Sequence, residues 1–343
     1  MEKRYWLYLL VVIILLVIIL YIHTAMNRRK HAQIETFRIA ELPLALNREN
    51  LFIEDPNIWC NKLATYWLFM NQPNVEARGQ NKLVELQEKY RSSGIQPISN
   101  VEKRDITAAL ELNIKSLATS NPNIYHYLKY WSQRFKLAKG ANWLEGGMPH
   151  THEDVIILPA SYFTPTGFQF PTFFHEITHI HQRKYPEDWD DLIWRWGFQH
   201  YNFLDSPASG LENIMARNRT NPDGLDVNYV WKCPTSSKYY WIGAIYSTIT
   251  PTSLTDGIQY IACELNLDNS NNYRFTGTTI NLAQFGGFID YFGVRNNNYH
   301  PNEIIAEYMA KYLVGEELSN AGYQIFKRHV ETLIWPKYQN DEN

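Results

Sequence analysis

The stretch that decides the fold reads FFHEITHI, residues 173–180. Four apolar residues flank its histidines and favour a helix buried at the centre of a domain: Phe173, Phe174, Ile177 and Ile180. On a helix over residues 170–184, His175 and His179 lie four residues apart and therefore project from one face, one turn from each other. The stretch thus predicts a buried helix that presents two imidazoles side by side.

The two histidines and Glu176 form the pattern HExxH. Two imidazole nitrogens one turn apart reach a single Zn²⁺ at about 2 Å. Glu176 lies beside them, in position to hold the attacking water and take its proton. With 11 histidines in 343 residues, chance produces the pattern in roughly 2% of chains of this composition. On this pattern alone, a buried helix whose histidines make only local hydrogen bonds is the alternative.

A second segment, HPNEIIAEY over residues 300–308, offers the carboxylates that such a site needs. A catalytic zinc site has three protein ligands and one open position. Glu303 is the candidate third ligand, and Glu307 lies one turn further on the same face. From there Glu307 would accept the remaining N–H of a ligating histidine. The alternative is a helix whose two glutamates face solvent.

HEITH followed downstream by NEIIAE resembles the gluzincin group of zincin metallopeptidases, which includes thermolysin-like and lethal-factor-like enzymes. The resemblance covers about twenty residues in two segments. It implies one bound Zn²⁺ per chain, Glu176 as the general base and Glu307 as the support for a histidine ligand. The zinc ligands that it implies are His175, His179 and Glu303.

The gap from His179 to Glu303 is longer than is usual in that group, and a β-rich insertion would account for it. The fallback third ligands are, in order, Glu307, Glu264 and Glu212. The oxyanion of a tetrahedral intermediate also needs a stabilising donor. By proximity to Glu303 in the sequence, the candidates for this catalytic role are Tyr299 and His300, with Tyr291 weaker.

Zincins typically place a β-strand along the cleft edge, before the zinc helix, and a bound peptide pairs with it as an added strand. Residues 154–159, DVIILP, fit that position. His150 and His152 alternate with Asp154, so the three side chains face one way in an extended chain. They are candidates for a second metal site or for the cleft lining, whereas polar loop histidines are the default. Gln182 and Arg183 are expected only to cap the zinc helix or to pair on the surface.

Residues 5–22 carry no charge and consist almost wholly of aliphatic and aromatic side chains. The run is long enough to span most of a hydrocarbon core, which predicts an uncleaved single-pass membrane anchor in the lipid bilayer rather than a signal peptide. Basic residues flank it on both sides, so the positive-inside rule leaves the topology open. One glycosylation sequon, residues 218–220, weakly favours a luminal domain.

We expect an α+β class, with an anchor over residues 1–26, a connector over 27–48 and a zincin-like catalytic domain over 49–343. Within that domain we expect a helical part at 49–149, the edge strand and HExxH helix at 150–200, a β-rich insertion at 201–298, and the third-ligand and C-terminal helices at 299–343. Helices are predicted over residues 82–91, 105–117, 125–137, 170–184, 302–313 and 321–334. Strands are predicted over residues 154–159, 239–248, 257–265 and 273–283.

Composition limits the function classes. The net charge of −3 and pI near 6.4 give no basic excess for binding nucleic acid. Cys60, Cys233 and Cys263 are far apart in the sequence and lack CxxC spacing, so we expect buried thiols rather than a disulfide framework. The many aromatic residues are expected to fill the core.

The sequence therefore predicts a membrane-anchored zinc metalloendopeptidase acting on a peptide or protein substrate. One rival is a non-catalytic, membrane-anchored structural or interaction protein on a zincin scaffold, such as a virion component in a viral or host internal membrane. A third interpretation keeps the zinc but hydrolyses a non-peptide amide or ester. The intact HExxH with its glutamate favours the enzyme.

Overall fold

The structure is a computed structural model of the chain. It describes residues 51–55, 90–164, 166–201, 208–219, 228–249, 257–269, 272–293 and 299–339. The predicted anchor at residues 5–22, the connector at 27–48, most of the predicted helix at 82–91, and Cys60 lie outside these ranges. Within them, no helix is both long enough and apolar enough to cross a bilayer.

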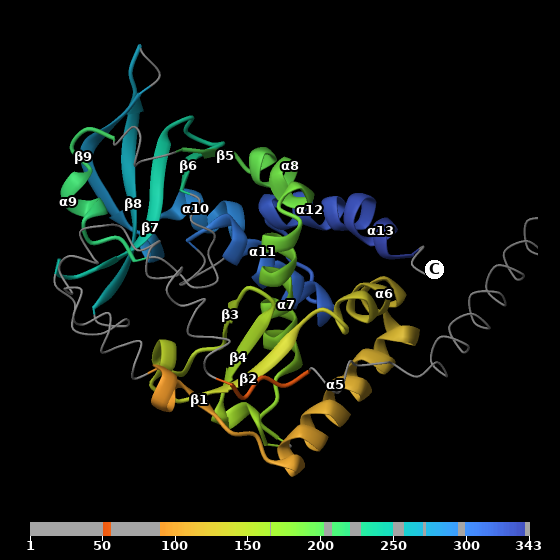
Figure 1. Cartoon of the computed structure of the whole chain (residues 1–343). Helices are drawn as coiled ribbons and strands as arrows, with labels where there is room; N and C mark the ends of the chain where they lie inside the picture. Colours follow the sequence, from red (N-terminus) through yellow and green to blue (C-terminus); the bar gives the residue numbers. More distant parts are fainter. Residues whose placement is uncertain are drawn as a thin grey trace, which may run out of the picture.

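A four-stranded sheet forms the lower part of the molecule in Figure 1. Its strands, in spatial order, are β1 (Ile95–Gln96), β2 (Lys136–Gly140), β4 (Val155–Pro159) and β3 (His150–His152). β2 and β4 run parallel, whereas β1 and β3 pair antiparallel with their neighbours. Every residue of β4 is buried, as a continuous apolar run between two partners should be.

Among the described residues, the strand at the edge of this sheet before the HExxH helix is therefore β3, and the prediction that residues 154–159 form it is wrong. β4 has the stronger strand sequence because it is buried on both faces and paired on both sides. β3 reads HTH and has no such apolar run. The pairing of β2 with β4 places β4 inside the sheet and leaves β3 as its outer strand among the described residues.

Two helices lie between β1 and β2 in the chain, α5 (Asn100–Ser120) and α6 (Pro122–Trp131). α5 includes the predicted helix at 105–117 but begins earlier, because Ser99 and Glu102 form a reciprocal capping box. The single stretch predicted over 125–137 is divided. α6 ends at Trp131, and residues 136–140 join the sheet as β2 because they pair with β4 in full register.

Two central helices carry the candidate site, α7 (Phe170–Lys184) and α11 (Pro301–Leu313), and they pack against each other. Each has a proline in its first turn, where the missing N–H costs nothing. Phe173, Phe174 and Ile177 are fully buried in the main core. The predicted helices at 170–184 and 302–313 are confirmed.

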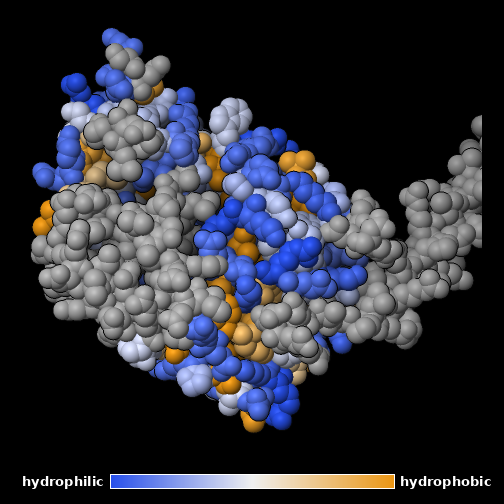
Figure 2. Space-filling view, viewed as in Figure 1, coloured by the Kyte–Doolittle hydropathy of each residue, from blue (hydrophilic) through white to orange (hydrophobic). Residues whose placement is uncertain are grey.

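Further helices surround this pair: α8 (Glu187–Arg195), α10 (Gly286–Phe292), α12 (Ala321–His329) and α13 (Trp335–Gln339). A π-helical turn over Val330–Ile334 joins α12 to α13, so the predicted helix at 321–334 is confirmed and extends beyond its predicted end. In Figure 2, hydrophobic residues form a narrow band down the middle of the face shown, between hydrophilic surfaces, over the region where α7 and the four-stranded sheet lie in Figure 1.

The predicted β-rich insertion forms a second, antiparallel sheet at the upper left of Figure 1. Its strands follow each other in sequence order: β5 (Phe198–His200), β6 (Tyr229–Lys232), β7 (Tyr239–Tyr246), β8 (Ile258–Leu267) and β9 (Tyr273–Asn281). One short helix, α9 (Glu212–Met215), accompanies them. The predicted strands at 239–248, 257–265 and 273–283 correspond to β7, β8 and β9, and the α+β class is confirmed.

Two of the three cysteines fall within the described ranges. Cys233 and Cys263 are both buried free thiols, as predicted. Burial raises the pKa of the Cys263 thiol to about 11, which keeps it protonated and unreactive at neutral pH.

Candidate metal centre

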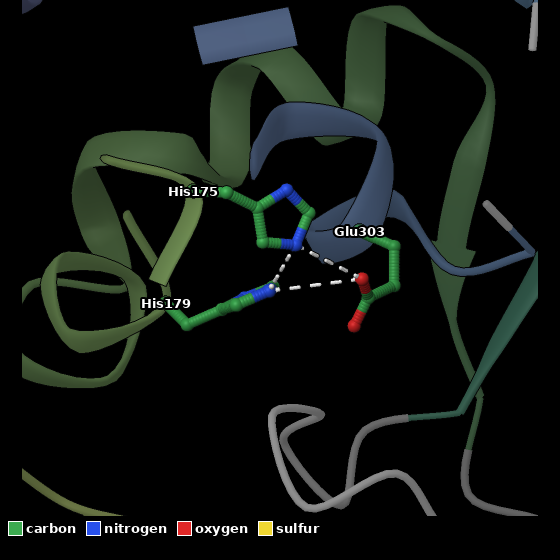
Figure 3. Close-up of side chains that lie close together, drawn as sticks. All are labelled: His175, His179 and Glu303. Carbon is green, nitrogen blue, oxygen red and sulfur yellow. Dashed lines mark hydrogen bonds and ion pairs between the residues drawn. The ribbon is translucent and has the colours of Figure 1, made fainter. Parts of the chain in front are cut away.

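His175, His179 and Glu303 converge on one point between α7 and α11 (Figure 3). The Nε2 atoms of the two histidines lie 3.0 Å apart. Glu303 Oε2 lies 3.5 Å from His175 Nε2 and 3.7 Å from His179 Nε2. Three groups that are distant in sequence thus present one ligand atom each to a common centre.

These spacings match those expected around zinc. Tetrahedral ligands at about 2.0–2.1 Å from the metal are separated from each other by roughly 3.3 Å, and the three measured distances lie on either side of that value. Two imidazoles and one carboxylate are also the ligand set of a catalytic zinc site with one position left open. The residues present therefore fit the group that the sequence pattern implies.

Within the described ranges, these three residues are the single group of three or more potential ligands whose atoms lie close enough to share an ion. The fallback ligands lie elsewhere. Glu264 pairs with Lys238 Nζ at 3.0 Å, and Glu212 accepts a hydrogen bond from the Gly210 N–H. Glu307 pairs with Lys311 Nζ at 3.5 Å. The geometry therefore favours Glu303 as the third ligand.

Glu303 owes its position to the start of α11. His300 is the N-cap of that helix, and its Nδ1 accepts a hydrogen bond from the Asn302 N–H at 3.3 Å. Glu303 therefore stands in the first turn, where the partial positive charge of the helix N-terminus favours a carboxylate. The neighbouring Ile304, Ile305 and Ala306 are fully buried, which holds α11 against the core.

The electrostatics of the site keep Glu303 anionic. Burial alone would raise the pKa of this carboxyl, but the charge of His179 and hydrogen bonds from both histidines outweigh burial and hold the pKa well below its usual range. A carboxylate that stays ionised in a buried place is prepared to receive a cation.

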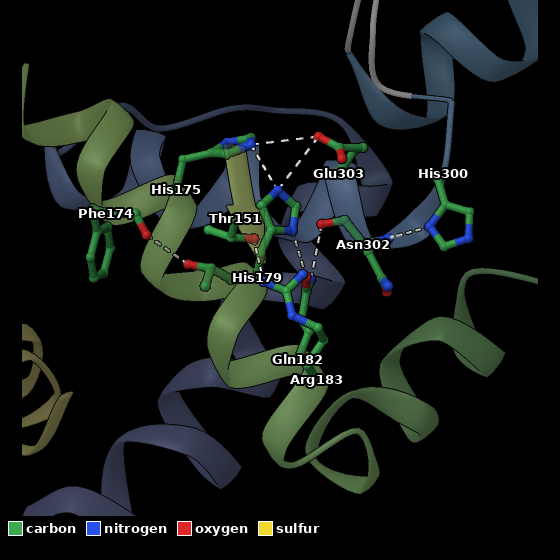
Figure 4. A network of polar contacts seen from close by, with 10 residues as sticks. Thr151, Phe174, His175, His179, Gln182, Arg183, His300, Asn302 and Glu303 are labelled. Atoms are coloured by element: carbon green, nitrogen blue, oxygen red, sulfur yellow. Dashed lines mark hydrogen bonds and ion pairs between the residues drawn. The ribbon is translucent and has the colours of Figure 1, made fainter. Parts of the chain in front are cut away.

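The second nitrogen of His179 has a partner that the sequence analysis did not assign. His179 Nδ1 lies 2.9 Å from Gln182 Oε1, and Gln182 Nε2 donates to the Asn302 carbonyl at 2.9 Å (Figure 4). Gln182 was expected to cap the helix or pair on the surface, but it is only 2% exposed. The contact predicted for Glu307 thus belongs to Gln182.

Arg183, the neighbour of Gln182, contacts β3. Its guanidinium bonds the Thr151 hydroxyl and donates to the Glu153 carbonyl at 3.3 Å. These contacts attach the last turn of α7 to β3 and to the turn that follows it, and they are more than the surface pairing expected from the sequence.

Glu176, the predicted general base, is 3% exposed and follows directly on the ligand His175. Its position on α7 follows from the HExxH spacing, which places it beside the two histidines. A buried carboxyl group next to candidate metal ligands is suited to proton transfer.

The predicted oxyanion donors have other contacts. The His300 ring packs against Tyr229, with ring centroids 5.3 Å apart, in addition to capping α11. Tyr299 packs against Tyr260 of β8, with ring centroids 5.2 Å apart. Its neighbour Tyr260, half-buried, was not identified from the sequence.

Tyr260 lies in the electrostatic field of the site. Its pKa is raised, first by burial and also by the negative charge of Glu303, while the positive charge of Arg219 opposes the rise. The phenol therefore stays protonated at neutral pH and able to donate a hydrogen bond. No local pattern marks it, because a tyrosine in a strand is ordinarily a packing residue.

Arg219 and Glu145 form a buried ion pair beside Tyr260. Their guanidinium and carboxylate groups are 2.8 Å apart, and the side chains are 5% and 3% exposed. The Arg219 N–H donates to the Ala244 carbonyl, and Ala244 pairs with Tyr260 in the next strand. Within the sequon, Asn218 is half-buried and its backbone forms an isolated antiparallel bridge with Ile245.

The candidates for a second metal site are dispersed. The His150 and His152 rings are buried and perpendicular, 5.4 Å apart. Asp154, however, pairs with Lys136 Nζ at 2.9 Å, and these three residues do not form a group of close ligand atoms.

No protein-family model, curated protein or solved structure matches this chain. The main indication of function is therefore the convergence of His175, His179 and Glu303 from two helices.

Proposed function

We propose that the chain is a zinc-dependent metalloendopeptidase of the gluzincin kind, with His175, His179 and Glu303 as the metal ligands. The observation that supports it is the placement of these three ligand atoms at the mutual distances that zinc requires, with Glu176 beside them. Zn²⁺ bound there would polarise the scissile carbonyl and lower the pKa of the attacking water.

Glu176 is the general base in this proposal. Its carboxylate takes a proton from the attacking water as the water oxygen bonds to the carbonyl carbon. It then delivers that proton to the departing nitrogen as the carbon–nitrogen bond breaks. Its near-complete burial limits competition from bulk solvent for this proton.

Tyr260 is the donor that we propose for the developing oxyanion, in place of Tyr299 and His300. Its ring packs against Tyr299, four residues before Glu303, and the charge of Glu303 contributes to the raised pKa of the Tyr260 phenol. His300 is engaged at the N-cap of α11, and Tyr299 packs against the face of Tyr260. In this proposal Tyr299 supports the position of Tyr260.

A peptide is the substrate that the edge strand favours. Among the residues that the structure describes, β3 is the outer strand of its sheet, and it pairs with β4 and packs against the zinc helix α7. An extended peptide can add to such an edge through main-chain hydrogen bonds. This favours a peptide over a non-peptide amide or ester. The anchor at residues 5–22 would hold the enzyme at a membrane, with either topology.

The test is the zinc content of the purified full-length chain, measured by elemental analysis beside two matched variants. We expect one zinc per chain in the parent protein and in Glu307→Ala, because Glu307 pairs with Lys311 instead of the histidines. Glu303→Ala should lose the zinc or bind it far more weakly. Retention in Glu303→Ala with loss in Glu307→Ala would overturn the ligand assignment, and a folded parent that binds no zinc would overturn the proposal.

A further inference from the structure

Gln182 is a buried side chain that touches both helices of the metal centre. It lies on α7, three residues after the ligand His179. Its Oε1 is 2.9 Å from His179 Nδ1, and its Nε2 is 2.9 Å from the carbonyl oxygen of Asn302, the residue before Glu303. Gln182 and Asn302 are 120 positions apart in the sequence. One amide thus contacts one ligand and the backbone beside another (Figure 4).

The Asn302 contact fixes the orientation of this amide. A backbone carbonyl only accepts hydrogen bonds, so the amide nitrogen must face it. The amide oxygen must then face His179, and this oxygen also only accepts. Nδ1 of His179 therefore carries the proton whenever the imidazole is neutral, and the lone pair of Nε2 is then available to a metal ion.

The same amide also links the two helices α7 and α11 through its two hydrogen bonds. A change in its position would alter the orientation of the His179 ring and the attachment of the first turn of α11, which carries Glu303. Because Gln182 is neutral, it supports the histidine without adding a second negative charge beside the Glu303 carboxylate. A carboxylate in this place would raise the basicity of the ligand.

We infer that Gln182 is a positioning residue that selects the metal-binding tautomer of His179 and joins the two ligand-bearing helices. The inference rests on the proposed zinc site for its consequence in metal affinity. The tautomer itself exists before any metal binds, so the two claims can be tested separately.

The experiment uses the full-length chain in detergent, with three variants. Gln182→Met keeps the length of the side chain but removes both hydrogen bonds. Gln182→Glu keeps the acceptor for His179 and loses the donor to Asn302. Gln324→Met is the matched control, because Gln324 Nε2 donates to the Leu318 carbonyl at an exposed position of α12.

Two quantities are measured on each protein. Zinc affinity is obtained by competition with a chromophoric chelator. The tautomer of His179 is obtained from the ¹⁵N shifts of the zinc-free protein, labelled at histidine and held near pH 8.5 so that imidazoles are neutral. The second measurement does not depend on whether the parent binds zinc or cleaves peptides.

We expect Gln182→Met to weaken zinc binding by about 10- to 100-fold and to move the proton of His179 away from Nδ1. Gln182→Glu should keep the Nδ1 proton and bind zinc at least as tightly as the parent, even with a lower melting temperature. Gln324→Met should match the parent in both measurements.

Two results would overturn the inference. The first is an unchanged His179 tautomer in Gln182→Met. The second is an equal loss of zinc affinity in Gln182→Met and Gln182→Glu that is proportional to the loss of unfolding free energy in each variant. A parent with the Nδ1 tautomer but no zinc affinity would leave the tautomer claim intact and would contradict the proposed function instead.

Discussion

At the scale of single residues, Tyr260 of β8 packs against Tyr299, which lies just before α11. Tyr260 and Tyr299 are in ring contact, and Tyr260 experiences the charges of both Glu303 and Arg219. Only one of the two is proposed to touch the reacting carbonyl. A pair of conservative substitutions distinguishes their roles.

Tyr260→Phe should lower kcat by about 100- to 1,000-fold, because loss of one oxyanion donor has an effect of that size. Its zinc content should be unchanged. Tyr299→Phe, the matched control, keeps the ring packing and should lose much less. The measurement is the steady-state cleavage of a quenched peptide by zinc-loaded protein. A larger loss in Tyr299→Phe would reverse the assignment.

At this scale the sequence predicts side chains whose roles depend on local spacing. His175 and His179 are fixed relative to each other by one helical turn, and Glu303 by its place in NEIIAE. The roles of Gln182 and Tyr260 depend on which backbone or side chain reaches them from elsewhere, and no spacing contains that information. Glu307 lies on the helix where the sequence predicted it, but it pairs with Lys311 and not with a histidine.

At the scale of elements, a buried polar network connects α7 to four neighbouring helices. His181 Nε2 lies 2.9 Å from Asp188 Oδ2 of α8, and the Tyr127 hydroxyl of α6 lies 3.2 Å from His181 Nδ1. Lys337 of α13 pairs with the other oxygen of Asp188, and His329 of α12 donates to the Asp188 carbonyl at 2.8 Å. Four helices are thus fixed to the helix that carries the ligands.

His329 should make the stability of this network depend on pH. Burial is the main cause that lowers the pKa of its imidazole below the ordinary 6.5. The unfolded chain therefore binds more protons than the folded chain between the lowered pKa and 6.5, so this contribution is present above 6.5 and is lost as the pH falls through that window. His329→Gln keeps a donor for the Asp188 carbonyl and does not titrate.

The measurement is urea unfolding of the parent and His329→Gln at pH 7.5 and pH 5.5. The parent should lose more unfolding free energy than the variant between these two values. The contributions of the other histidines are common to both proteins and cancel in the comparison. Equal losses, or a smaller loss in the parent, would show that His329 is not held neutral by burial.

Elements with a complete local pattern were predicted well. α7 and α11 have helical periodicity with proline in the first turn, and β7 to β9 are rich in β-branched and aromatic residues separated by turn residues. Residues 125–137 and the identity of the edge strand were predicted wrongly. Both depend on which strands pair, since β4 pairs with β2 on one side and with β3 on the other, and the local pattern of each segment does not specify its partner.

At the scale of the whole molecule, the Arg219–Glu145 pair connects the part of the chain just before β3 to the β-rich insertion. Removing one partner of a buried ion pair leaves an uncompensated charge, which costs roughly 3–5 kcal/mol. Arg219→Met should therefore reduce the free energy of unfolding by about that amount.

The double variant Arg219→Met/Glu145→Met should lose clearly less than the sum of the two single variants, because no buried charge remains. Urea unfolding of the four proteins gives the coupling energy. Additive losses would show that the two side chains do not stabilise each other across this contact.

The molecule brings its chemistry together from segments that are distant in sequence. α7 supplies the HExxH face, α11 supplies Glu303, and the insertion between them supplies Tyr260 and Arg219. The sequence indicates that an insertion separates the two ligand segments. That the insertion folds back beside the ligands follows only from the tertiary structure.

The most direct test of the central claim is the cleavage of a quenched peptide library by the full-length protein and by Glu176→Gln, with zinc measured in both. We predict one zinc per chain in each protein and hydrolysis by the parent alone, since the amide cannot take the proton from water. Equal hydrolysis by Glu176→Gln, or a zinc-loaded parent that cleaves no peptide in the library, would contradict the account.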